Sequence, residues 1–427
     1  MDRVGCIVIK EERAATRPIA YVAAVLPAAS ETFVYREIRE LRRRGWTVVP
    51  ASLNPPVPVP GGGAPDAFED LREGLLVLYG KQAATTMGAA LLESIRHPAR
   101  SASTLLFAVS DALNPGEALS IVGRLKLMAQ AVAALGLARS LRSRGVRHVH
   151  CHFAHAPTTI GMYAALQMGV PFSFTGHAND LFQRRTLLKR KLERARFVAC
   201  ISRWHRAFYR EVEGRHPERY VVVRCGVDVT EWLPRDPDRE VGPRFRLLTV
   251  CRLVEKKGTD TLIEALHTLD CRRGGAWELT VAGDGPDRDR LQALARRLGC
   301  EDAICWLGAV ENSRVRELLA GADALVLPCR TDSSGDRDGI PVVLMEAMAS
   351  GVPVIAGDLP AIRELVDGRE AGLLVPGGEP SKLAEALGRL RSDASLRGSL
   401  SVAGRAVIED EFSLAGNVSR LEAQFRK

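Results

Sequence analysis

The feature that most constrains the fold is an alternation of strand-like and helix-like segments, which occurs twice along the chain. Ile19 to Pro27 is an apolar, strand-like run, residues 31–45 have a helical pattern, and residues 47–53 form the next strand-like run. Such units close as parallel sheets with helices on both faces. The alternation restarts at residue 244, after a charged and proline-rich stretch at 234–243. The sequence therefore predicts an α/β fold of two Rossmann-like, doubly wound domains facing each other across a cleft.

The expected domain boundaries follow from that stretch. Residues 1–236 form the predicted N-terminal domain, and residues 243–410 form the predicted C-terminal domain. The helix-prone tail at 411–427 is expected to pack back on the first domain. A chain of 427 residues with 46% hydrophobic content is long enough for two substantial cores.

The charge is unevenly distributed. Residues 1–240 carry 34 Lys and Arg against 23 Asp and Glu, a net +11, whereas residues 241–427 carry 25 against 28, a net −3. A basic front half predicts an anionic ligand or surface for that half. Nucleic acid is not expected, because no basic motif is interleaved with aromatic residues and no zinc-finger spacing occurs. The nine cysteines are odd in number and contain no CxxC pair, which favours a reducing cytoplasm.

The stretch from Arg337 to Gly357 predicts an anion-binding helix start. Pro341 suits the first position of a helix, which would leave the amides of Val342 and Val343 free to bind a phosphate or diphosphate. Asp338 would flank that anion. Glu346 lies in the apolar run VVLMEAMA, where an unpaired charge is costly, and a sugar or ribose hydroxyl is its expected partner. The alternative is an ordinary acid at a helix start and a solvated helix face.

Two cations follow the first strand-like run of the second domain. Arg252 and Lys257 lie just beyond residues 244–250, at the sheet edge where α/β proteins bind ligands. An arginine fork and a lysine point charge suit the oxygens of a diphosphate leaving group. The alternative is that both are solvated loop charges.

Three segments together resemble family 4 of the retaining glycosyltransferases. They are residues 251–266, residues 281–291 and residues 338–356, with residues 308–329 between the last two. The front half resembles bacterial exopolysaccharide transferases of the colanic-acid type more loosely, through SETFVYREIREL and FTGHANDLF. The resemblance implies the GT-B architecture. In this chain Cys251 and Asp338 stand where the family usually has Gly and Glu.

The resemblance also implies roles for individual residues. Glu346 would hold the nucleotide ribose and Asp338 would lie near the donor-sugar hydroxyls. The catalytic residues implied are His177, Arg252, Lys257 and Asp338. The donor-binding residues expected are Arg252, Lys257, Gly283, Gly308, Asp338, Gly339, Ile340, Pro341, Val342, Val343 and Glu346.

Two of these glycines have competing interpretations. Gly283 opens GDGP after a strand-like run, but the third glycine of a dinucleotide-binding GxGxxG pattern would fall at Arg288, so a tight turn near the nucleotide is expected. Gly308 either lets the backbone approach the base or is a simple turn glycine.

The front half offers acceptor-side candidates. His177 follows the strand-like FSFT at a carboxyl edge, and similar transferases place a histidine there against donor or acceptor; a structural histidine is the alternative. Glu31, Thr32, Asn179 and Asp180 are the other expected acceptor-side residues, although Glu31 and Asp180 could equally serve helix starts.

A metal site is not expected. His148, His150 and His152 alternate on one face of a strand, but that face must pack or point into the cleft, and HExxH and CxxC spacings are absent. Asp336 and Asp338 are better explained by the loop than by a DxD-type metal site.

The sequence thus predicts a retaining, metal-independent hexosyltransferase that needs no cofactor. It would move a hexose from a UDP- or GDP-sugar to a growing, lipid-linked exopolysaccharide or surface glycan. The alternative, motivated by Cys251 and Asp338, is a non-catalytic nucleotide-sugar-binding scaffold subunit.

Membrane contact is expected to be peripheral, on the inner face of the cell membrane of a cytoplasmic protein. No signal peptide is evident, and no apolar run approaches about 18 uninterrupted residues. Residues 184–196 carry seven basic residues and one acid around a short leucine stripe, which predicts either docking on an anionic membrane or a solvated helix.

Overall fold

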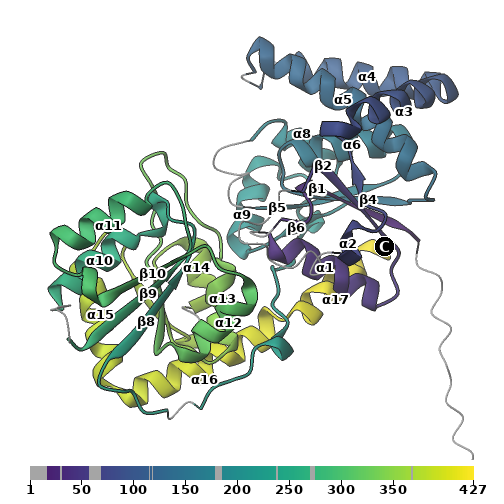
Figure 1. The fold of residues 1–427 in the computed structure, drawn as a ribbon. Helices are drawn as coiled ribbons and strands as arrows, with labels where there is room; N and C mark the ends of the chain where they lie inside the picture. Colours follow the sequence, from purple (N-terminus) through teal and green to yellow (C-terminus); the bar gives the residue numbers. More distant parts are fainter. Residues whose placement is uncertain are drawn as a thin grey trace, which may run out of the picture.

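The computed structural model describes most of the chain as two α/β units, each built on one parallel sheet (Figure 1). The described residues are 17–28, 31–56, 69–114, 116–117, 119–177, 185–236, 239–269, 275–366 and 369–427. The two predicted Rossmann-like, doubly wound units are confirmed.

The N-terminal sheet has seven strands in the order β3-β2-β1-β4-β5-β6-β7. The strands are β1 (Ile19–Val25), β2 (Val48–Asn54), β3 (Leu76–Val77), β4 (His148–His152), β5 (Phe172–Gly176), β6 (Val198–Cys200) and β7 (Tyr220–Val222). All described pairings are parallel, and β1 lies between β2 and β4. The strand order reverses at β1 and β4. In open α/β sheets, ligands bind outside the carboxyl ends of the strands at such a reversal.

Helices cover both faces of this sheet. They are α1 (Thr32–Arg43), α2 (Glu69–Arg72), α3 (Ala83–Arg96), α4 (Pro98–Ala112), α5 (Ile121–Arg142), α6 (Ala156–Met168), α8 (Leu188–Arg194) and α9 (Arg203–Val212). Helix α1 shows why the sequence places them so: Val34, Ile38 and Leu41 recur at helical spacing and are buried against the sheet. The opposite face packs on α5 and α6.

The C-terminal sheet has six strands in the order β10-β9-β8-β11-β12-β13. The strands are β8 (Phe245–Val250), β9 (Trp277–Ala282), β10 (Ile304–Gly308), β11 (Ala324–Leu327), β12 (Val354–Gly357) and β13 (Leu373–Val375). All described pairings are again parallel, and the order reverses between β8 and β11. The loops that follow these two strands are therefore neighbours at the carboxyl edge.

One face of this sheet packs on α10, α11 and α15, and the other on α12, α13, α14 and α16. Their bounds are α10 (Thr259–Thr268), α11 (Arg288–Arg297), α12 (Asn312–Gly321), α13 (Val342–Ala349), α14 (Pro360–Val366), α15 (Pro380–Ser392) and α16 (Ala394–Glu411). Cys300, shortly after α11, is disulfide-bonded. The expectation of reduced cysteines therefore does not extend to it.

The chain crosses back to the N-terminal domain after α16. Val227 and Ser413 form an isolated parallel β-bridge, so the outgoing and returning segments lie side by side. Helix α17 (Leu414–Phe425) then packs on α1, where Glu422 accepts hydrogen bonds from Arg44 and from the Trp46 indole. The tail thus lies against the first domain.

Helices α3, α4 and the first half of α5 form a layer that extends away from the C-terminal domain (Figure 1). Within the described chain, α5 alone is long and apolar enough by composition to span a membrane. Its second half, however, is buried against the sheet and α6, as in the core helix of a soluble domain.

Candidate active site

The loops after β8 and β11 bring together the cations and the acid that the sequence singled out. The Lys257 ammonium lies 2.9 Å from the Asp338 carboxylate, and Lys256 lies 3.5 Å from the other oxygen of that carboxylate. Backbone contact between the loops supports this arrangement, because the Arg330 N–H donates to the Lys256 carbonyl at 2.9 Å. A lysine and an acid 81 positions apart in sequence therefore meet because their strands are neighbours.

This pair is largely buried, and burial disfavours both charges. Attraction to Asp338 outweighs that penalty for Lys257 and raises the pKa of its ammonium above the ordinary value. For Asp338, burial raises the pKa, but Lys257 and Lys256 outweigh it and hold the pKa below its usual range. The Cys329 thiol adds a hydrogen bond to Asp338 at 3.2 Å. Both groups are therefore charged at neutral pH.

Arg252 differs from its neighbours in being exposed at the end of β8. None of its described contacts is a side-chain hydrogen bond or an ion pair. It is the cation of this edge that is most available to an incoming anion. The Cys251 thiol beside it lies 3.8 Å from the Thr259 hydroxyl at the start of α10.

Helix α13 begins at Val342, one residue later than predicted, because Pro341 is the N-cap with extended backbone (φ −63°, ψ 130°). The Leu344 N–H donates to the Pro341 carbonyl at 3.1 Å. The amides of Val342 and Val343 precede that bond, and the first amides of any helix have no carbonyl one turn earlier. Gly339 and Ile340 lead from Asp338 into this helix start. A helix start therefore lies beside Asp338, and that it binds an anion stays a prediction.

Glu346 has a partner that the sequence did not predict. Its buried carboxylate lies 3.1 Å from the Arg36 guanidinium on α1, so the ion pair joins the two domains. Burial raises the pKa of Glu346 and outweighs the opposing attraction of Arg36. The expected partner, a sugar or ribose hydroxyl, stays a prediction, whereas in the structure Arg36 pairs with this acid. A ribose would have to share Glu346 with Arg36.

Gly283 holds three strand ends close together. Its φ of 142° is unfavourable for other residues, and an added Cβ would lie 1.8 Å from the Cys251 carbonyl oxygen. Its N–H donates to the Gly308 carbonyl at 2.7 Å. The turn interpretation thus fits both glycines, at the carboxyl ends of β9 and β10.

On the opposite domain, His177 follows β5 at the carboxyl edge, where the sequence placed it. Its ring packs against both Phe33 and Phe153, with centroids 4.6 Å away in each case, and these two rings also contact each other at 6.3 Å. Burial, reinforced by the neighbouring His152, lowers the pKa of His177 well below its ordinary value, so the ring is neutral at physiological pH. Phe153 has φ 72°, which is rare for a bulky residue and marks a constrained turn at the end of β4.

A line of histidines runs from His177 into the domain along β4. His152 Nδ1 lies 3.3 Å from His177 Nε2, and His152 Nε2 lies 3.3 Å from the Glu37 carboxylate, which also accepts from Tyr21 at 2.6 Å. His148 and His150 pack against Phe425 of α17. The shared face that the sequence predicted is thus covered by the returning tail, and only its far end reaches the cleft.

Glu37, His150 and His152 bring three possible metal-ligand atoms within 4.8 Å of one another. The sequence had grouped only the histidines. Both nitrogens of His150 already contact hydroxyls, Ser173 at 2.8 Å and Thr175 at 3.1 Å. With the Glu37 oxygen engaged as well, these residues serve as a hydrogen-bonded core more readily than as an ion-binding site.

The remaining acceptor-side candidates are only partly described. Glu31 is the N-cap of α1 and Thr32 is its first residue, so both lie at the carboxyl edge beside Phe33. Asn179 and Asp180 lie outside the described residues.

Comparison with known proteins identifies the chain. Residues 235–407 match the family described as "Glycosyl transferases group 1", and residues 107–231 match "Glycosyltransferase Family 4". The chain belongs to family 4 of the glycosyltransferases. The first match spans the C-terminal sheet, and the second spans β4 to β7 of the N-terminal sheet.

Among curated relatives of this glycosyltransferase, a putative colanic acid biosynthesis glycosyltransferase from Salmonella typhimurium is 36% identical over 47% of this chain and 49% of the relative. An amylovoran biosynthesis glycosyltransferase from Erwinia amylovora is 33% identical over 56% of this chain and 59% of the relative. A GDP-mannose-dependent phosphatidylinositol monomannoside mannosyltransferase from Mycobacterium tuberculosis is 37% identical over 42% of this chain and 49% of the relative. The alignments span about half the length of these relatives.

Solved structures confirm the GT-B fold. A glycosyltransferase from Rickettsia africae has a TM-score of 0.67 at 16% identity, covering 96% of this chain and 98% of that one. Anabaena HepE in complex with UDP and glucose also has a TM-score of 0.67 at 16% identity, covering 96% and 99%. At such identities the likeness concerns the architecture alone.

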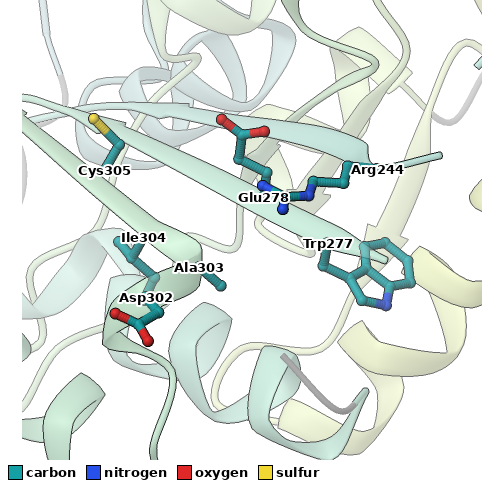
Figure 2. A pocket seen from close by; sticks show the side chains of 7 residues that line it. All are labelled: Arg244, Trp277, Glu278, Asp302, Ala303, Ile304 and Cys305. Carbon is teal, nitrogen blue, oxygen red and sulfur yellow. The ribbon is translucent and has the colours of Figure 1, made fainter. Parts of the chain in front are cut away.

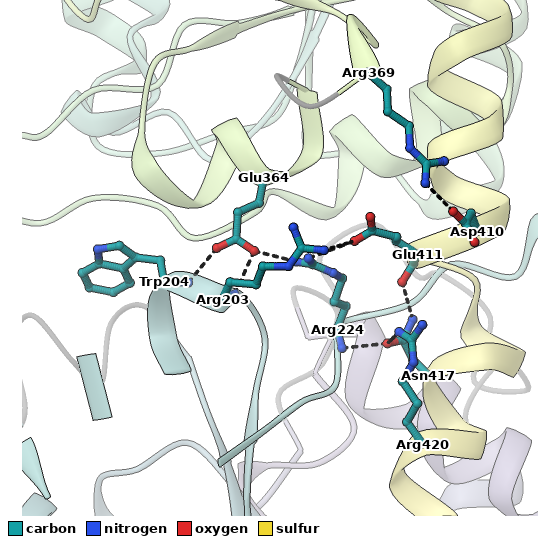
Figure 3. Close-up of polar contacts among 9 residues, drawn as sticks. All are labelled: Arg203, Trp204, Arg224, Glu364, Arg369, Asp410, Glu411, Asn417 and Arg420. Carbon is teal, nitrogen blue, oxygen red and sulfur yellow. Dashed lines mark hydrogen bonds and ion pairs between the residues drawn. The ribbon is translucent and has the colours of Figure 1, made fainter. Parts of the chain in front are cut away.

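A second set of contacts joins the domains of this glycosyltransferase (Figure 3). The Glu364 carboxylate on α14 accepts from the backbone N–H groups of Arg203 and Trp204, each at 2.7 Å, and from the Arg224 guanidinium at 3.0 Å. The same Arg224 reaches Glu411 at 3.1 Å. A carboxylate of one domain thus caps the start of α9 in the other.

Concavity alone does not locate the site. The cavity of about 120 Å³ in Figure 2 lies where β9 and β10 begin, at the edge opposite the predicted donor-binding loops. Its lining residues are Arg244, Trp277, Glu278, Asp302, Ala303, Ile304 and Cys305. None of the predicted site residues is among them.

The stretch at 184–196, expected either to dock on an anionic membrane or to form a solvated helix, is only partly exposed. Lys191 is buried and donates to three carbonyls, of Ala154, His155 and Thr186. Arg190 and Arg194 pair with the buried Asp111 of α4. Three of the four bases of α8 thus contact the protein, whereas Lys189 is exposed. Arg184 lies outside the described residues.

Sequence reasoning also missed Arg36, Glu37, Phe33 and Phe153. The first three lie on α1, whose pattern indicates an amphipathic helix but not the partners of its polar residues. For Phe153 the signal was its place directly after β4, at the reversal of strand order.

Proposed function

We propose that this protein transfers a hexose from a nucleotide diphosphate sugar, a UDP- or GDP-sugar, to a growing and lipid-linked exopolysaccharide or surface glycan. The anomeric configuration is retained, and the reaction needs no metal ion. The enzyme works at the cytoplasmic face of the membrane. The observation that carries the proposal is the meeting of Lys257, Asp338, exposed Arg252 and the start of α13 at the strand-order reversal of the C-terminal sheet.

The chemistry of that edge suits departure of a nucleoside diphosphate. Negative charge develops on the leaving phosphate, and fixed cations and amides aimed at that position stabilise it. Arg252 supplies a fork of N–H donors, and the first amides of α13 supply further donors with the favourable end of the helix dipole. Lys257 is held in place by Asp338 until a phosphate competes for it. In this mechanism no side chain acts as a covalent nucleophile.

The N-terminal domain supplies the opposing surface. His177 packs against two phenylalanine rings at the carboxyl edge of the first sheet, which would give a hexose an apolar wall and a neutral hydrogen-bonding ring. Relatives named for colanic acid and amylovoran biosynthesis support a surface polysaccharide product. A relative named as GDP-mannose-dependent and acting on a phosphatidylinositol mannoside supports a nucleotide sugar and a lipid-linked acceptor. Anabaena HepE, with UDP and glucose bound, supports the same donor class.

Donor hydrolysis tests the proposal. The purified chain is incubated with a panel of UDP- and GDP-hexoses, and release of the nucleoside diphosphate is measured with and without a metal chelator. We expect slow hydrolysis of one donor class, unchanged by the chelator. Nucleotide binding without any hydrolysis or transfer would instead favour the scaffold subunit, for which the full engagement of Asp338 by two lysines is the supporting observation.

A further inference from the structure

The helical layer of α3, α4 and the first half of α5 carries an unusual concentration of exposed apolar side chains. Eleven of the fifteen large apolar side chains that are exposed in the described chain belong to residues 87–125. They are Met87, Leu91, Leu92, Ile95, Leu106, Phe107, Val109, Leu113, Ile121, Val122 and Leu125. Single exposed leucines need no explanation, but a concentration of this size on one layer marks an interaction surface.

The exposure is regular rather than accidental. On α3, Leu91 and Ile95 are one helical turn apart, and on α5 the same spacing separates Ile121 from Leu125. Ile95, Leu106 and Ile121 are 67%, 69% and 77% exposed, so they lie on the outer side of each helix. The inner sides pack together and onto α6. The layer therefore has a packed interior and an apolar outer surface.

Every acid of this layer is engaged with the protein. Glu93 is buried and paired with Arg142, and Asp111 is buried and paired with Arg190 and Arg194 of α8. Glu117, in the connection to α5, accepts from the backbone N–H of Leu187. No acid in the described part of residues 81–130 is therefore left to face solvent freely.

The bases of the layer have the opposite disposition. Lys81, Arg96, Arg100 and Lys126 are exposed, and Arg124 is half-buried. An apolar surface rimmed by cations, with its acids turned inward, is the composition that binds the headgroup region of an anionic bilayer.

We infer that the outer face of α3, α4 and the first half of α5 docks this protein on an anionic lipid bilayer. The inference deepens the proposed function and rests on it, because a lipid-linked acceptor would reach the N-terminal domain from that bilayer. A second copy of the chain is a poorer occupant. A two-fold dimer through this face would bring two sets of the same cations together without an opposing acid.

The layer also takes over the role that the sequence assigned to α8. Arg190 and Arg194 of α8 pair with Asp111, and Arg194 lies 4.6 Å from the Phe107 ring centroid. These contacts hold α4 against α8 and the rest of the domain. Helix α8 thus supports the docking layer instead of forming it.

The test is co-sedimentation of the full chain with vesicles of phosphatidylcholine, alone or mixed with phosphatidylglycerol, at low and high salt. We expect binding to the anionic vesicles that weakens with salt. The triple variant Ile95→Ser, Leu106→Ser, Ile121→Ser and the charge variant Arg96→Glu, Lys126→Glu should each bind about tenfold less. The matched controls Leu233→Ser, Val402→Ser and Arg297→Glu change exposed side chains elsewhere and should bind as wild type does.

The charge variant keeps the inference testable should the serine variant fold poorly. Absence of wild-type binding to anionic vesicles, or equal binding by wild type and the charge variant, would overturn the inference. Dimerisation of wild type that both layer variants abolish would assign the face to a second copy and also overturn it. Donor hydrolysis in vesicle-free buffer is expected to be unchanged in every variant. Its absence in wild type would count against the proposed function without touching the vesicle result.

Discussion

The Arg36 guanidinium on α1 lies 3.1 Å from the Glu346 carboxylate on α13, and this buried ion pair joins the two domains across 310 positions of sequence. Both partners lie at carboxyl edges that face the proposed donor site. The pair therefore links domain contact to the acid expected to bind the nucleotide. A nucleotide that engages Glu346 would compete with Arg36 and so affect how the domains meet.

The first prediction concerns this pair. Arg36→Ala leaves the Glu346 carboxylate buried without its cation, which should cost about 3 kcal/mol of stability at neutral pH. The pKa of Glu346 is already raised above its ordinary value. The folded state thus holds the proton to higher pH than the unfolded state, and stability falls as pH rises above the ordinary value of 4.5. Without Arg36 the pKa of Glu346 should rise further, so the pH range over which stability falls should widen.

Thermal unfolding midpoints at pH 5 and pH 8 test this, at roughly the two ends of the window. The variant should lose more stability between those pH values than wild type does. Arg39→Ala is the matched control, because Arg39 lies on the same helix in an exposed pair with Asp70. Equal pH dependence in Arg36→Ala and Arg39→Ala would contradict the prediction.

The second prediction concerns the proposed diphosphate site. Arg252→Ala should lower turnover by about 100-fold while leaving the fold intact, because one preorganised electrostatic donor typically contributes that much. Lys257→Ala should lower it at least as far, and it should also destabilise the protein because Asp338 loses its close partner. The assay is steady-state donor hydrolysis, with Arg297→Ala on α11 as the exposed-arginine control. Full activity in Arg252→Ala and Lys257→Ala would remove the central assignment.

Much of the fold could be predicted from local patterns. The alternation of strands and helices predicted the two sheets. The cations after β8 and the acid after β11 were predicted from one rule, that ligands bind at the carboxyl ends of the strands. Pro341 located the start of α13 to within one residue because proline has a strong positional preference there.

The unpredicted part depends on contacts between distant segments. No periodicity links Arg36 to Glu346, and none reveals that Phe425 of the returning tail covers His148 and His150. The bases of α8 form a typical membrane-docking pattern, yet Asp111, about 80 positions earlier, turns two of them inward. Charge patterns predict surfaces only when no buried partner of opposite charge exists, and sequence alone does not show that partner.

A third prediction separates the two acids of the donor site. Glu346→Gln should weaken binding of bare UDP or GDP, because the proposed ribose contact is present without a sugar. Asp338→Asn should act mainly on the sugar-bearing donor. Thermal shifts measured with each nucleotide and its hexose derivative distinguish the two, since a ligand at 100-fold its dissociation constant adds about 2.7 kcal/mol. Equal effects of either variant on both ligands would show that the roles are divided wrongly.

A fourth prediction concerns acid stability. Burial lowers the pKa of His148 to about 3 and that of His205 to about 3. These two imidazoles therefore bind protons near pH 6.5 in the unfolded chain but stay neutral there in the folded chain. Stability thus falls as pH drops below 6.5. Each histidine should contribute up to about 1.4 kcal/mol of loss per pH unit in that window. His148→Gln should flatten the midpoint-versus-pH curve below 6.5, whereas the exposed His267→Gln should leave it unchanged.

The last prediction concerns Glu37, which we regard as a positioning residue for His177. A carboxylate only accepts hydrogen bonds, so the Glu37 contact at 3.3 Å places a proton of the His152 ring on Nε2. When that is the only proton of the ring, His152 Nδ1 accepts and His177 Nε2, 3.3 Å away, donates. The Glu37 carboxylate thus sets, through the His152 ring, which nitrogen of His177 is protonated.

Glu37→Gln should disturb this order, because an amide can donate as well as accept. We expect turnover to fall by about tenfold with little change in nucleotide affinity, and the ring nitrogen chemical shifts of His177 should report a second tautomer. Glu40→Gln is the matched control on the same helix, since Glu40 pairs outward with Arg43 and Arg44. A loss of stability with an unchanged tautomer would reduce Glu37 to a structural role. An unchanged turnover would remove the relay from the mechanism, because the protonation state of His177 would then not depend on the buried carboxylate.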